Sequence, residues 1–456
     1  MEESKLLNNI SQIETDLDLC AETIIGIPLW RLVRYQTRLH FITAQTGYVA
    51  RTAPVKIVGK RVLKSFSGFW KLFSIKGATW FFPFNRLVLC NDYYLDKFID
   101  PPIEKSELRN NKYVVVDPPG YVGKYKRIHK NHVIDNESRT VFRKLLSFVC
   151  KFYVKVAYSG QIKRLFHKVQ DPFNLPETIM DSYYTSVSRF ISSYVYYRLW
   201  FSILKPKRVF IVYREGYFPI IAACKKLSIP IAEFQHGITL DNTVSYTGEY
   251  DVRIDPDYFF VFGDYWKGPQ FGMPLDRIHC IGWAYSKYLS EQQHYDVKYK
   301  RDTVLVISSM EITDSILEAV ACLSHAYPAV KFHIRLHPCE SYNEEQNAKL
   351  EKIENASIVD NSIDSTTALM SYHLVIGENS SVIYEALSLG CKVGMLNLCG
   401  LRSPIDKPGI KENFFAINDI KDFEQFLSEE KSSASNAEFY SDFDSEAFMN
   451  FINEKM

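Results

Sequence analysis

Two short polar motifs in the second half of the chain have the residue types that bind phosphate. The first is Arg335-Leu336-His337-Pro338, and the second is Gly377-Glu378-Asn379-Ser380-Ser381. Imidazole and hydroxyl groups donate hydrogen bonds to phosphate oxygens, and the free backbone N–H groups at the start of a helix attract anions. Together the two motifs predict an anion site.

Each motif follows a predicted strand. Lys331–Leu336 has apolar residues at alternate positions, and Leu374–Ile376 is a short apolar run of the buried-strand type. Ser380 opens a segment with helical apolar spacing, which Gly390 ends. Open α/β sheets bind ligands at the carboxyl ends of their strands, so we expect both motifs at one sheet edge. The predicted phosphate-binding residues are His337, Pro338, Asn379, Ser380 and Ser381, with Ser308 and Ser309 after the predicted strand Thr303–Ile307.

The sequence leaves a structural alternative open for both motifs. Ser380 or Ser381 could be simply an N-cap, which any helix can have. His337 could be a strand-end histidine whose hydrogen bonds are satisfied within the protein. The two motifs support each other because both are expected at the same edge.

The first half of the chain supplies candidate acid–base residues at other predicted strand ends. The strand Arg208–Val212 is followed by Arg214-Glu215-Gly216, and Pro230–Phe234 is followed by Gln235-His236-Gly237. A group-transfer enzyme needs a base for its acceptor hydroxyl. The predicted catalytic residues are Glu215, His236 and Asp241, with Asp264 as a further carboxylate. Glu215 could instead form a structural ion pair with Arg214.

The whole chain has the composition of a globular protein with two or three domains. It has 456 residues, of which 46% are hydrophobic and 23% charged, and its net charge of +1 gives no argument for nucleic acid. Strands and helices alternate in two blocks, which predicts two Rossmann-like domains facing across a cleft. We predict a peripheral helical and basic region at 1–85, a first Rossmann-like domain at 86–290, a second Rossmann-like domain at 302–430 and an acidic tail at 431–456.

Other classes of site lack their motifs. The chain has no Gly-x-x-x-x-Gly-Lys-Ser/Thr loop and no Gly-x-Gly-x-x-Gly after a strand, and its Asp-x-Asp pairs follow no convincing strand. We therefore expect no metal and no resident cofactor. Nine scattered cysteines without CxxC pairs, and the lack of a signal peptide or long apolar run, predict a cytoplasmic protein.

A basic segment near the N-terminus predicts contact with a membrane. No acidic residue lies between Glu22 and Asp92, and basic residues interleave with aromatic ones over Val55–Phe82. This composition suits the inner surface of a membrane, where aromatic rings enter the interface and lysines meet anionic headgroups. A core helix with a solvated basic face is the alternative, and nucleic acid is a weaker one because no binding module accompanies the segment.

The two phosphate motifs resemble the His-Pro and serine motifs of bacterial GT-B glycosyltransferases, especially the CMP-sugar-dependent sialyltransferases and Kdo transferases. The resemblance implies that His337, Ser380 and Ser381 hold the CMP phosphate. In those families an acidic-acidic-Gly motif supplies the catalytic carboxylate. Here the matching motif is Arg214-Glu215-Gly216, in which an arginine replaces the first acid.

Two neighbouring families share parts of the pattern. Gln235-His236-Gly237, with His337 and Ser380-Ser381, is similar to CDP-glycerol glycerophosphotransferases. Glu385-Ala386-Leu387 with Gly390 is similar to the donor helix of GT-B transferases that use UDP- or GDP-hexoses. All three resemblances imply a donor site in the second half of the chain.

We therefore expect a metal-independent GT-B glycosyltransferase of surface polysaccharide synthesis, peripheral at the inner membrane. Its expected partners are a nucleotide-sugar, most simply a CMP-linked acid sugar such as Kdo or sialic acid, and a lipid-linked glycan acceptor. The alternatives are a UDP- or GDP-hexose transferase, a CDP-glycerol glycerophosphotransferase and a non-catalytic, membrane-associated scaffold. Arg214 in place of the first acid favours the scaffold, whereas the intact serine motif opposes it.

Overall fold

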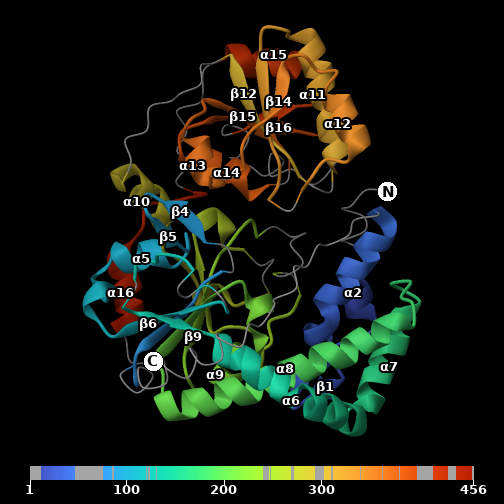
Figure 1. The fold of residues 1–456 in the computed structure, drawn as a ribbon, viewed down its shortest axis with the longest axis vertical. Helices are drawn as coiled ribbons and strands as arrows, with labels where there is room; N and C mark the ends of the chain where they lie inside the picture. The colour runs from blue at the N-terminus through green and yellow to red at the C-terminus, as the bar shows by residue number, and fades with distance from the viewer. Residues whose placement is uncertain are drawn as a thin grey trace. The chain divides into compact units, whose positions relative to one another are not determined.

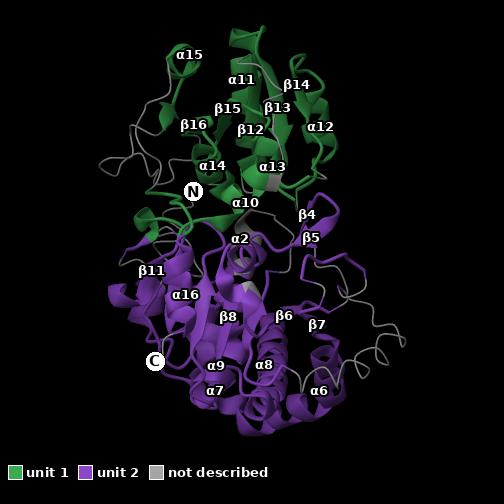
Figure 2. Ribbon diagram, turned by 90° about the vertical axis from the view of Figure 1, so that its left-hand side faces the viewer, with its two compact units in different colours: residues 1–8, 262–266, 282–443 green, residues 9–261, 267–281, 444–456 purple. Residues whose placement is uncertain are grey.

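The chain forms two compact units, coloured separately in Figure 2. Unit 2 contains residues 9–261, 267–281 and 444–456, and unit 1 contains 1–8, 262–266 and 282–443. The structure is a computed structural model, and it describes residues 12–46, 75–84, 87–119, 121, 124–129, 131–239, 246, 248–268, 272–292, 302–309, 312–338, 340–361, 363–378, 380–397, 414–429 and 438–453.

Unit 2 is built on a seven-stranded parallel sheet with the order β11-β10-β9-β8-β3-β6-β7. The chain fills one side of β3 with β6 and β7 and then crosses to the other side with β8, so the strand order reverses between β3 and β8. Ligands bind at such a switch point in open α/β sheets. The strands are β3 (Thr79–Phe82), β6 (Tyr113–Asp117), β7 (Val133–Asp135), β8 (Arg208–Val212), β9 (Ile231–Phe234), β10 (Tyr258–Val261) and β11 (Ile278–Cys280).

Helices cover both faces of this sheet because its strands are apolar on both sides. On one face, the ring of Trp80 lies 5.5 Å from that of Phe201 in helix α8 (Thr178–Leu204). On the other face, Phe210 lies 5.9 Å from Phe448 of helix α16 (Ser445–Asn453). The segment predicted as an acidic tail therefore contains a helix that packs into the core of unit 2 (Figure 1).

The remaining elements of unit 2 are short strands, short helices and three longer helices that precede β3 in the sequence or lie between the sheet strands. They are β1 (Thr23–Ile24), β2 (Ile27–Pro28), α2 (Leu29–Thr46), β4 (Val88–Cys90), β5 (Tyr93–Leu95), α5 (Asp100–Glu104), η1 (Glu107–Asn110), α6 (Glu137–Ala157), α7 (Ser159–Gln170), η2 (Arg214–Gly216), α9 (Phe218–Lys226) and η6 (Leu275–Arg277).

Part of the segment predicted to meet a membrane is core instead. Residues 55–74 lie outside the described residues, but Trp80, Phe81 and Phe82 form strand β3 and are 4%, 0% and 1% exposed. Because β3 lies between β6 and β8 and is covered on both faces, these three rings cannot enter a lipid interface. The prediction of a membrane contact is wrong for this part of the segment.

Unit 1 is built on a six-stranded parallel sheet with the order β14-β13-β12-β15-β16-β17. The chain starts at β12, adds β13 and β14 on one side and then crosses to β15, so its switch point lies between β12 and β15. The strands are β12 (Thr303–Ile307), β13 (Lys331–Arg335), β14 (Ala356–Ile358), β15 (Leu374–Gly377), β16 (Lys392–Leu396) and β17 (Phe415–Ile417).

The core of unit 1 joins the middle strands to helices on the sheet. Val304 and Val306 of β12 belong to one buried cluster with Ile316 and Val320 of α11 (Thr313–Ala326) and Phe423 of α15 (Ile420–Ser428). None of the helices in the described part of the chain has the length and apolarity that a membrane crossing requires. The helices of unit 1 are η4 (Asp264–Trp266), α10 (Ala284–Gln292), α11 (Thr313–Ala326), α12 (Glu344–Leu350), α13 (Ser365–Leu369), α14 (Ser381–Ser388) and α15 (Ile420–Ser428).

Candidate functional site

Three neighbouring strands of unit 1 bring the phosphate motifs to one edge. Ile307 of β12 pairs with Arg335 of β13 on one side and with Gly377 of β15 on the other. The segments that follow these three residues therefore leave the sheet at the same level, with neighbouring strands about 4.8 Å apart. This edge, which adjoins the switch point between β12 and β15, carries Ser308, Ser309, His337, Ser380 and Ser381.

Glu340 ties two of these segments together. Its Oε1 atom accepts hydrogen bonds from the hydroxyl groups of Ser308, at 2.8 Å, and Thr313, at 2.6 Å. Its Oε2 atom accepts from the backbone N–H of His337 at 2.8 Å. One carboxylate thus fixes the end of β12, the start of α11 and the segment after β13.

The side chain of Arg335, the last residue of β13, forms hydrogen bonds with backbone carbonyl groups. The guanidinium of Arg335 donates to the carbonyl oxygens of Asp360, at 3.2 Å, and Ile363, at 2.5 Å. Arg335 is buried, so it supports the loop rather than supplying charge at the edge. His337 is half-buried and Pro338 is exposed.

The serine loop has the geometry of a helix start. Ser380 is extended, with φ −123°, and its Oγ atom accepts from the N–H of Val382 at 3.3 Å, so it is the N-cap of α14. An N-cap hydroxyl accepts one bond and keeps its own proton, which can still be donated to a ligand. Ser381 is the first residue of α14, and Asn379 lies outside the described residues.

Gly377 allows this helix to begin close to the neighbouring strand. A Cβ atom at this position would lie 3.0 Å from the carbonyl oxygen of Ile307 and 3.2 Å from Cδ1 of Ile383 in α14. Both distances are tighter than ordinary contacts, so a larger residue would push β12 and α14 apart. The glycine keeps the N-terminus of α14 beside the end of β12.

A carboxylate on α14 faces the neighbouring helix. Glu385 is buried, and its Oε2 atom accepts from the hydroxyl of Thr366 at 2.6 Å. Thr366 lies in α13, whose N-cap is Asp364. Glu385 belongs to the motif Glu385-Ala386-Leu387, which with Gly390 resembles the donor helix of hexosyltransferases, and this contact fixes the orientation of its side chain.

In unit 2, the segment after β8 starts with an unusual backbone and a buried ion pair. Tyr213 has a φ of 70°, which is rare for a residue with a side chain and is found often at functional sites. Arg214 is buried and pairs with Glu233, at 2.7 Å, and Asp255, at 3.1 Å. Burial alone would lower the pKa of Arg214, but these two carboxylates raise it above its ordinary value. Arg214, which replaces the first acid of the motif, thus has a structural ion-pair role.

Glu215 follows at the switch point between β3 and β8. It is half-buried, and burial raises its pKa above the ordinary value, while Arg34, Arg31 and Arg38 of α2 oppose this rise. A carboxyl with a raised pKa exchanges its proton more easily near neutral pH. The environment of Glu215 is thus compatible with acid–base chemistry.

His236 lies within a set of aromatic rings after β9. Its ring centre is 4.5 Å from that of Tyr213 and 5.1 Å from that of Phe84, which follows β3. Its Nδ1 atom lies 2.9 Å from the hydroxyl oxygen of Tyr246. The ends of β3, β8 and β9 therefore meet around His236. These contacts orient its imidazole ring.

The other predicted carboxylates do not join this set in the described part of the structure. Asp241 lies outside the described residues. Asp264 is exposed and opens η4, which belongs to unit 1. Among the residues that the structure describes, no group of three or more His, Cys, Asp or Glu side chains is arranged to hold a metal ion.

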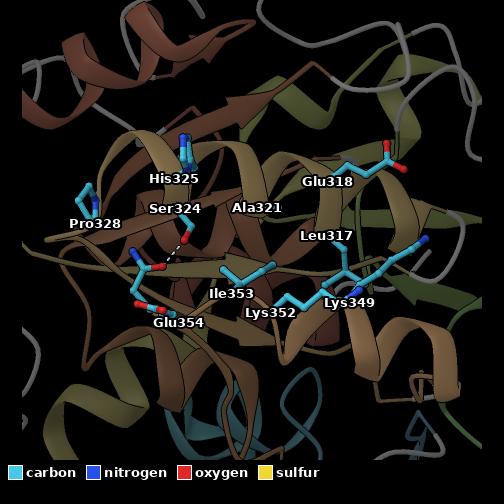
Figure 3. A pocket seen from close by; sticks show the side chains of 11 residues that line it. Leu317, Glu318, Ala321, Ser324, His325, Pro328, Lys349, Lys352, Ile353 and Glu354 are labelled. Carbon is cyan, nitrogen blue, oxygen red and sulfur yellow. Dashed lines mark hydrogen bonds between the residues drawn. The ribbon is translucent and has the colours of Figure 1, made fainter.

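A separate groove of about 800 Å³ lies on the flank of unit 1 (Figure 3). It runs along α11 and the segment after α12, with Leu317 and Ile353 in its wall and His325 and Lys352 at its margin. None of the predicted site residues lines it. The groove is therefore distinct from the strand edge described above.

Several residues of these sites gave no signal in the sequence. Glu340 lies two positions after Pro338, and Tyr246 lies ten after His236, but neither belongs to a recognisable motif. Glu233 is an acid within an apolar strand, and such a residue needs a buried partner. That anomaly could have indicated its pairing with Arg214.

Comparisons with known proteins show the fold. No protein-family model matches the chain, and no curated protein matches it in sequence. Among solved structures, it is similar to the UDP-GlcNAc 2-epimerase of Neisseria meningitidis bound to UDP-GlcNAc, with 13% identity, 82% of this chain and 99% of that chain covered, and a TM-score of 0.50. Two parallel Rossmann-like units and this similarity confirm the predicted GT-B fold class.

Two further similarities are looser. The Methanocaldococcus jannaschii UDP-GlcNAc 2-epimerase in complex with UDP-GlcNAc and UDP has 12% identity, 82% and 99% coverage, and a TM-score of 0.49. Staphylococcus aureus TarM in complex with UDP has 14% identity, 58% and 59% coverage, and a TM-score of 0.38. With TM-scores below 0.5, these two similarities carry no argument.

Proposed function

We propose that the chain is a glycosyltransferase that binds a nucleotide-sugar in unit 1 and activates an acceptor hydroxyl in unit 2. The observation that carries the proposal is the hydrogen-bonded edge of the six-stranded sheet, where Glu340 holds Ser308 and His337 at the level of the N-terminus of α14. Hydroxyl, imidazole and helix N–H donors are suited to the charge of a phosphate leaving group.

The transfer needs one bond to form and one to break. The acceptor oxygen attacks the anomeric carbon, and the bond between this carbon and the phosphate oxygen breaks. We assign stabilisation of the departing phosphate to His337, Ser380 and Ser381. The acceptor proton passes to Glu215, which follows β8, or to His236, which follows β9.

The donor that we propose is a UDP-linked sugar. Its support is the similar fold of the Neisseria meningitidis enzyme, which was solved with UDP-GlcNAc, and the resemblance of Glu385-Ala386-Leu387 with Gly390 to the donor helix of UDP-hexose transferases. A CMP-linked acid sugar is the competing donor, because the His-Pro and serine motifs that suggested it are both at the edge. The acceptor remains a proposed glycan or lipid-linked glycan.

Epimerisation of a nucleotide-sugar is the second candidate, because the Neisseria meningitidis enzyme is a UDP-GlcNAc 2-epimerase. Epimerisation needs no acceptor, so the two functions are separable. Incubation of UDP-GlcNAc with the protein alone, followed by NMR, would reveal the manno isomer that inversion at C2 produces. Its formation would replace the transferase proposal.

Calorimetric titration of the full chain with UDP, CMP, CDP and GDP, with and without EDTA, tests the donor site. We expect UDP to bind and His337→Ala to weaken it by about tenfold or more, the size of one lost hydrogen bond to a charged group. His325→Ala, which changes an exposed histidine of α11, is the control. Selective binding of CMP would favour the acid-sugar donor, and selective binding of CDP would favour glycerophosphotransfer. If none of the four nucleotides binds, the non-catalytic scaffold would be favoured.

A further inference from the structure

The outer face of helix α6 is an apolar stripe in contact with solvent. Leu145, Phe148, Val149, Phe152 and Val156 are 74%, 82%, 60%, 65% and 70% exposed. Their spacing of three and four residues places them along one side of the helix. Soluble surfaces rarely expose so many large apolar side chains together, so this stripe indicates an interaction site.

The opposite side of α6 anchors it to the unit. Cys150 and Val154 lie on this side and are buried, and near the start of the helix the ring of Phe142 lies 5.6 Å from that of Tyr196 in α8. Figures 1 and 2 both show α6, α7 and α8 grouped together in unit 2. Since the inner face is used for this packing, the apolar stripe is not needed for the core.

The sequence of α6 and α7 is strongly basic after the first residue of α6. Residues 138–170, which contain most of α6 and all of α7, include eight lysines and arginines and no acidic residue. Lys144, Lys151 and Lys155 are exposed and, at spacings of seven and four, form a row along one edge of the stripe. The stripe is therefore bordered along this edge by a row of basic side chains.

This charge decides between the two simplest partners. In a symmetric dimer the same face meets itself, so the lysine rows of two copies would approach each other and repel. An anionic bilayer offers a partner to both kinds of side chain: its negative headgroups attract the lysines, and the boundary of its acyl chains accommodates the phenylalanines. The combination of Phe148, Phe152 and a flanking lysine row fits the bilayer.

We propose that α6 is a membrane-surface helix, which places its Leu145–Val156 stripe in the headgroup region of an anionic bilayer. The helix lies on the membrane and does not cross it. This surface replaces the buried β3 part of Val55–Phe82 as the site of membrane contact. The proposal does not depend on the donor or on catalysis, so it can fail or hold independently of the proposed function.

The test is co-sedimentation of the full chain with vesicles. We expect binding to vesicles of equal phosphatidylcholine and phosphatidylglycerol, and weak binding to phosphatidylcholine alone. The double variant F148S/F152S should lower the partition constant by about tenfold or more, because the loss of buried apolar area outweighs 1.4 kcal/mol. The matched control is V252S/L275S, since Val252 and Leu275 are 62% and 61% exposed in the same unit.

A charge variant provides a second measurement on the same helix. Replacing Lys144, Lys151 and Lys155 by glutamine should lower binding to the anionic vesicles and reduce its dependence on salt. Circular dichroism checks that each variant is folded. The proposal is overturned if the wild-type chain ignores anionic vesicles, or if F148S/F152S binds them as well as the control. It is also overturned if light scattering shows a wild-type dimer that F148S/F152S separates, since the stripe would then bind a second copy.

Discussion

The hydroxyl of Ser308 donates a 2.8 Å hydrogen bond to the Oε1 atom of Glu340, joining the ends of strands β12 and β13. The same carboxylate accepts from the backbone N–H of His337, so it holds both segments in place. Positioning residues of this kind matter because a small displacement of a ligand-binding group costs much of its effect. Glu340 is thus the residue that assembles the proposed phosphate site.

Glu340→Gln should disrupt this assembly. The amide of glutamine has only one acceptor oxygen. Its NH₂ group would therefore face one of the groups that now donate a hydrogen bond to the carboxylate. We expect nucleotide affinity to fall by about tenfold or more, with a loss of about 2 kcal/mol in the stability of unit 1. Calorimetric titration and denaturant unfolding measure the two effects.

The control is Glu345→Gln on α12. Glu345 is exposed and pairs only at the surface with Lys349, at 3.2 Å. Such a pair contributes little, so both measurements should match the wild type. Unchanged nucleotide affinity in Glu340→Gln would contradict the positioning role.

The sequence predicted the second Rossmann-like unit closely, because its strands are short apolar runs separated by clear turns. The predicted strand Thr303–Ile307 and the helix near Ser365–Leu369 have the observed bounds. Ser380 also starts a helix as predicted, and its N-cap bond confirms the structural alternative for this residue without using the proton of its hydroxyl group. Local patterns sufficed where neighbouring residues alone decide the structure.

The rest depended on contacts between distant segments. The sheet of unit 2 begins with β3 at residue 79, before the predicted domain boundary at 86, and α16 returns to it from the last residues of the chain. The apolar runs of Thr79–Phe82 suit a core strand and a membrane interface equally well. Only the pairing of β3 with β6 and β8 distinguishes them.

His236→Ala should lower kcat with little effect on nucleotide affinity. Loss of a positioned acid or base costs about a hundredfold in rate or more, whereas the proposed donor site lies in unit 1. Steady-state kinetics and calorimetric titration separate the two effects. His167→Ala, at an exposed position of α7, is the control, and weakened nucleotide binding with unchanged kcat would contradict the assignment.

Tyr246→Phe tests how His236 is oriented. The variant removes the hydroxyl that lies 2.9 Å from Nδ1 of His236 and keeps the aromatic ring. We expect a smaller loss of kcat, about tenfold, with a displaced pH profile, because the imidazole loses a hydrogen-bond partner. A profile identical to that of the wild type would show that the hydroxyl has only a packing role.

The stability of unit 2 should fall as the pH rises from about 4 to about 7. Burial and the neighbouring Asp100 raise the pKa of Asp96 from 3.8 to about 7, while backbone N–H groups and Arg127 limit the rise. Between these pH values the folded carboxyl keeps a proton that the unfolded chain has released, so folding is favoured at the lower pH. Denaturant unfolding at pH 5 and pH 7.5 should differ by about 2 kcal/mol or more.

Asp96→Asn should reduce this difference, because the amide does not titrate. Asp171→Asn, at an exposed position in the same unit, should leave it unchanged. Asp117 also has a pKa raised to about 7, chiefly by burial, so part of the pH dependence should remain in Asp96→Asn. Stability that increases steadily with pH in the wild-type chain would show that these carboxyls are ionised throughout.

Arg214 and Glu215 are adjacent in sequence, but replacing them should change the stability of the fold by very different amounts. Arg214→Met leaves the buried carboxylates of Glu233 and Asp255 without their shared partner, which should cost about 3 to 5 kcal/mol of stability. Glu215→Gln should cost little stability, since burial already disfavours the charge of this group.

The sign of the Glu215 effect depends on pH. Because its pKa is raised in the folded chain, ionisation of Glu215 destabilises the fold at high pH, and Glu215→Gln should be slightly more stable than the wild type at pH 8 but not at pH 5. If Glu215 is the base, kcat should fall by about a hundredfold or more while the protein stays folded. Thermal unfolding at both pH values measures the effect of Glu215 on stability, and steady-state kinetics measures its effect on catalysis. A stable and fully active Glu215→Gln enzyme would leave His236 as the base.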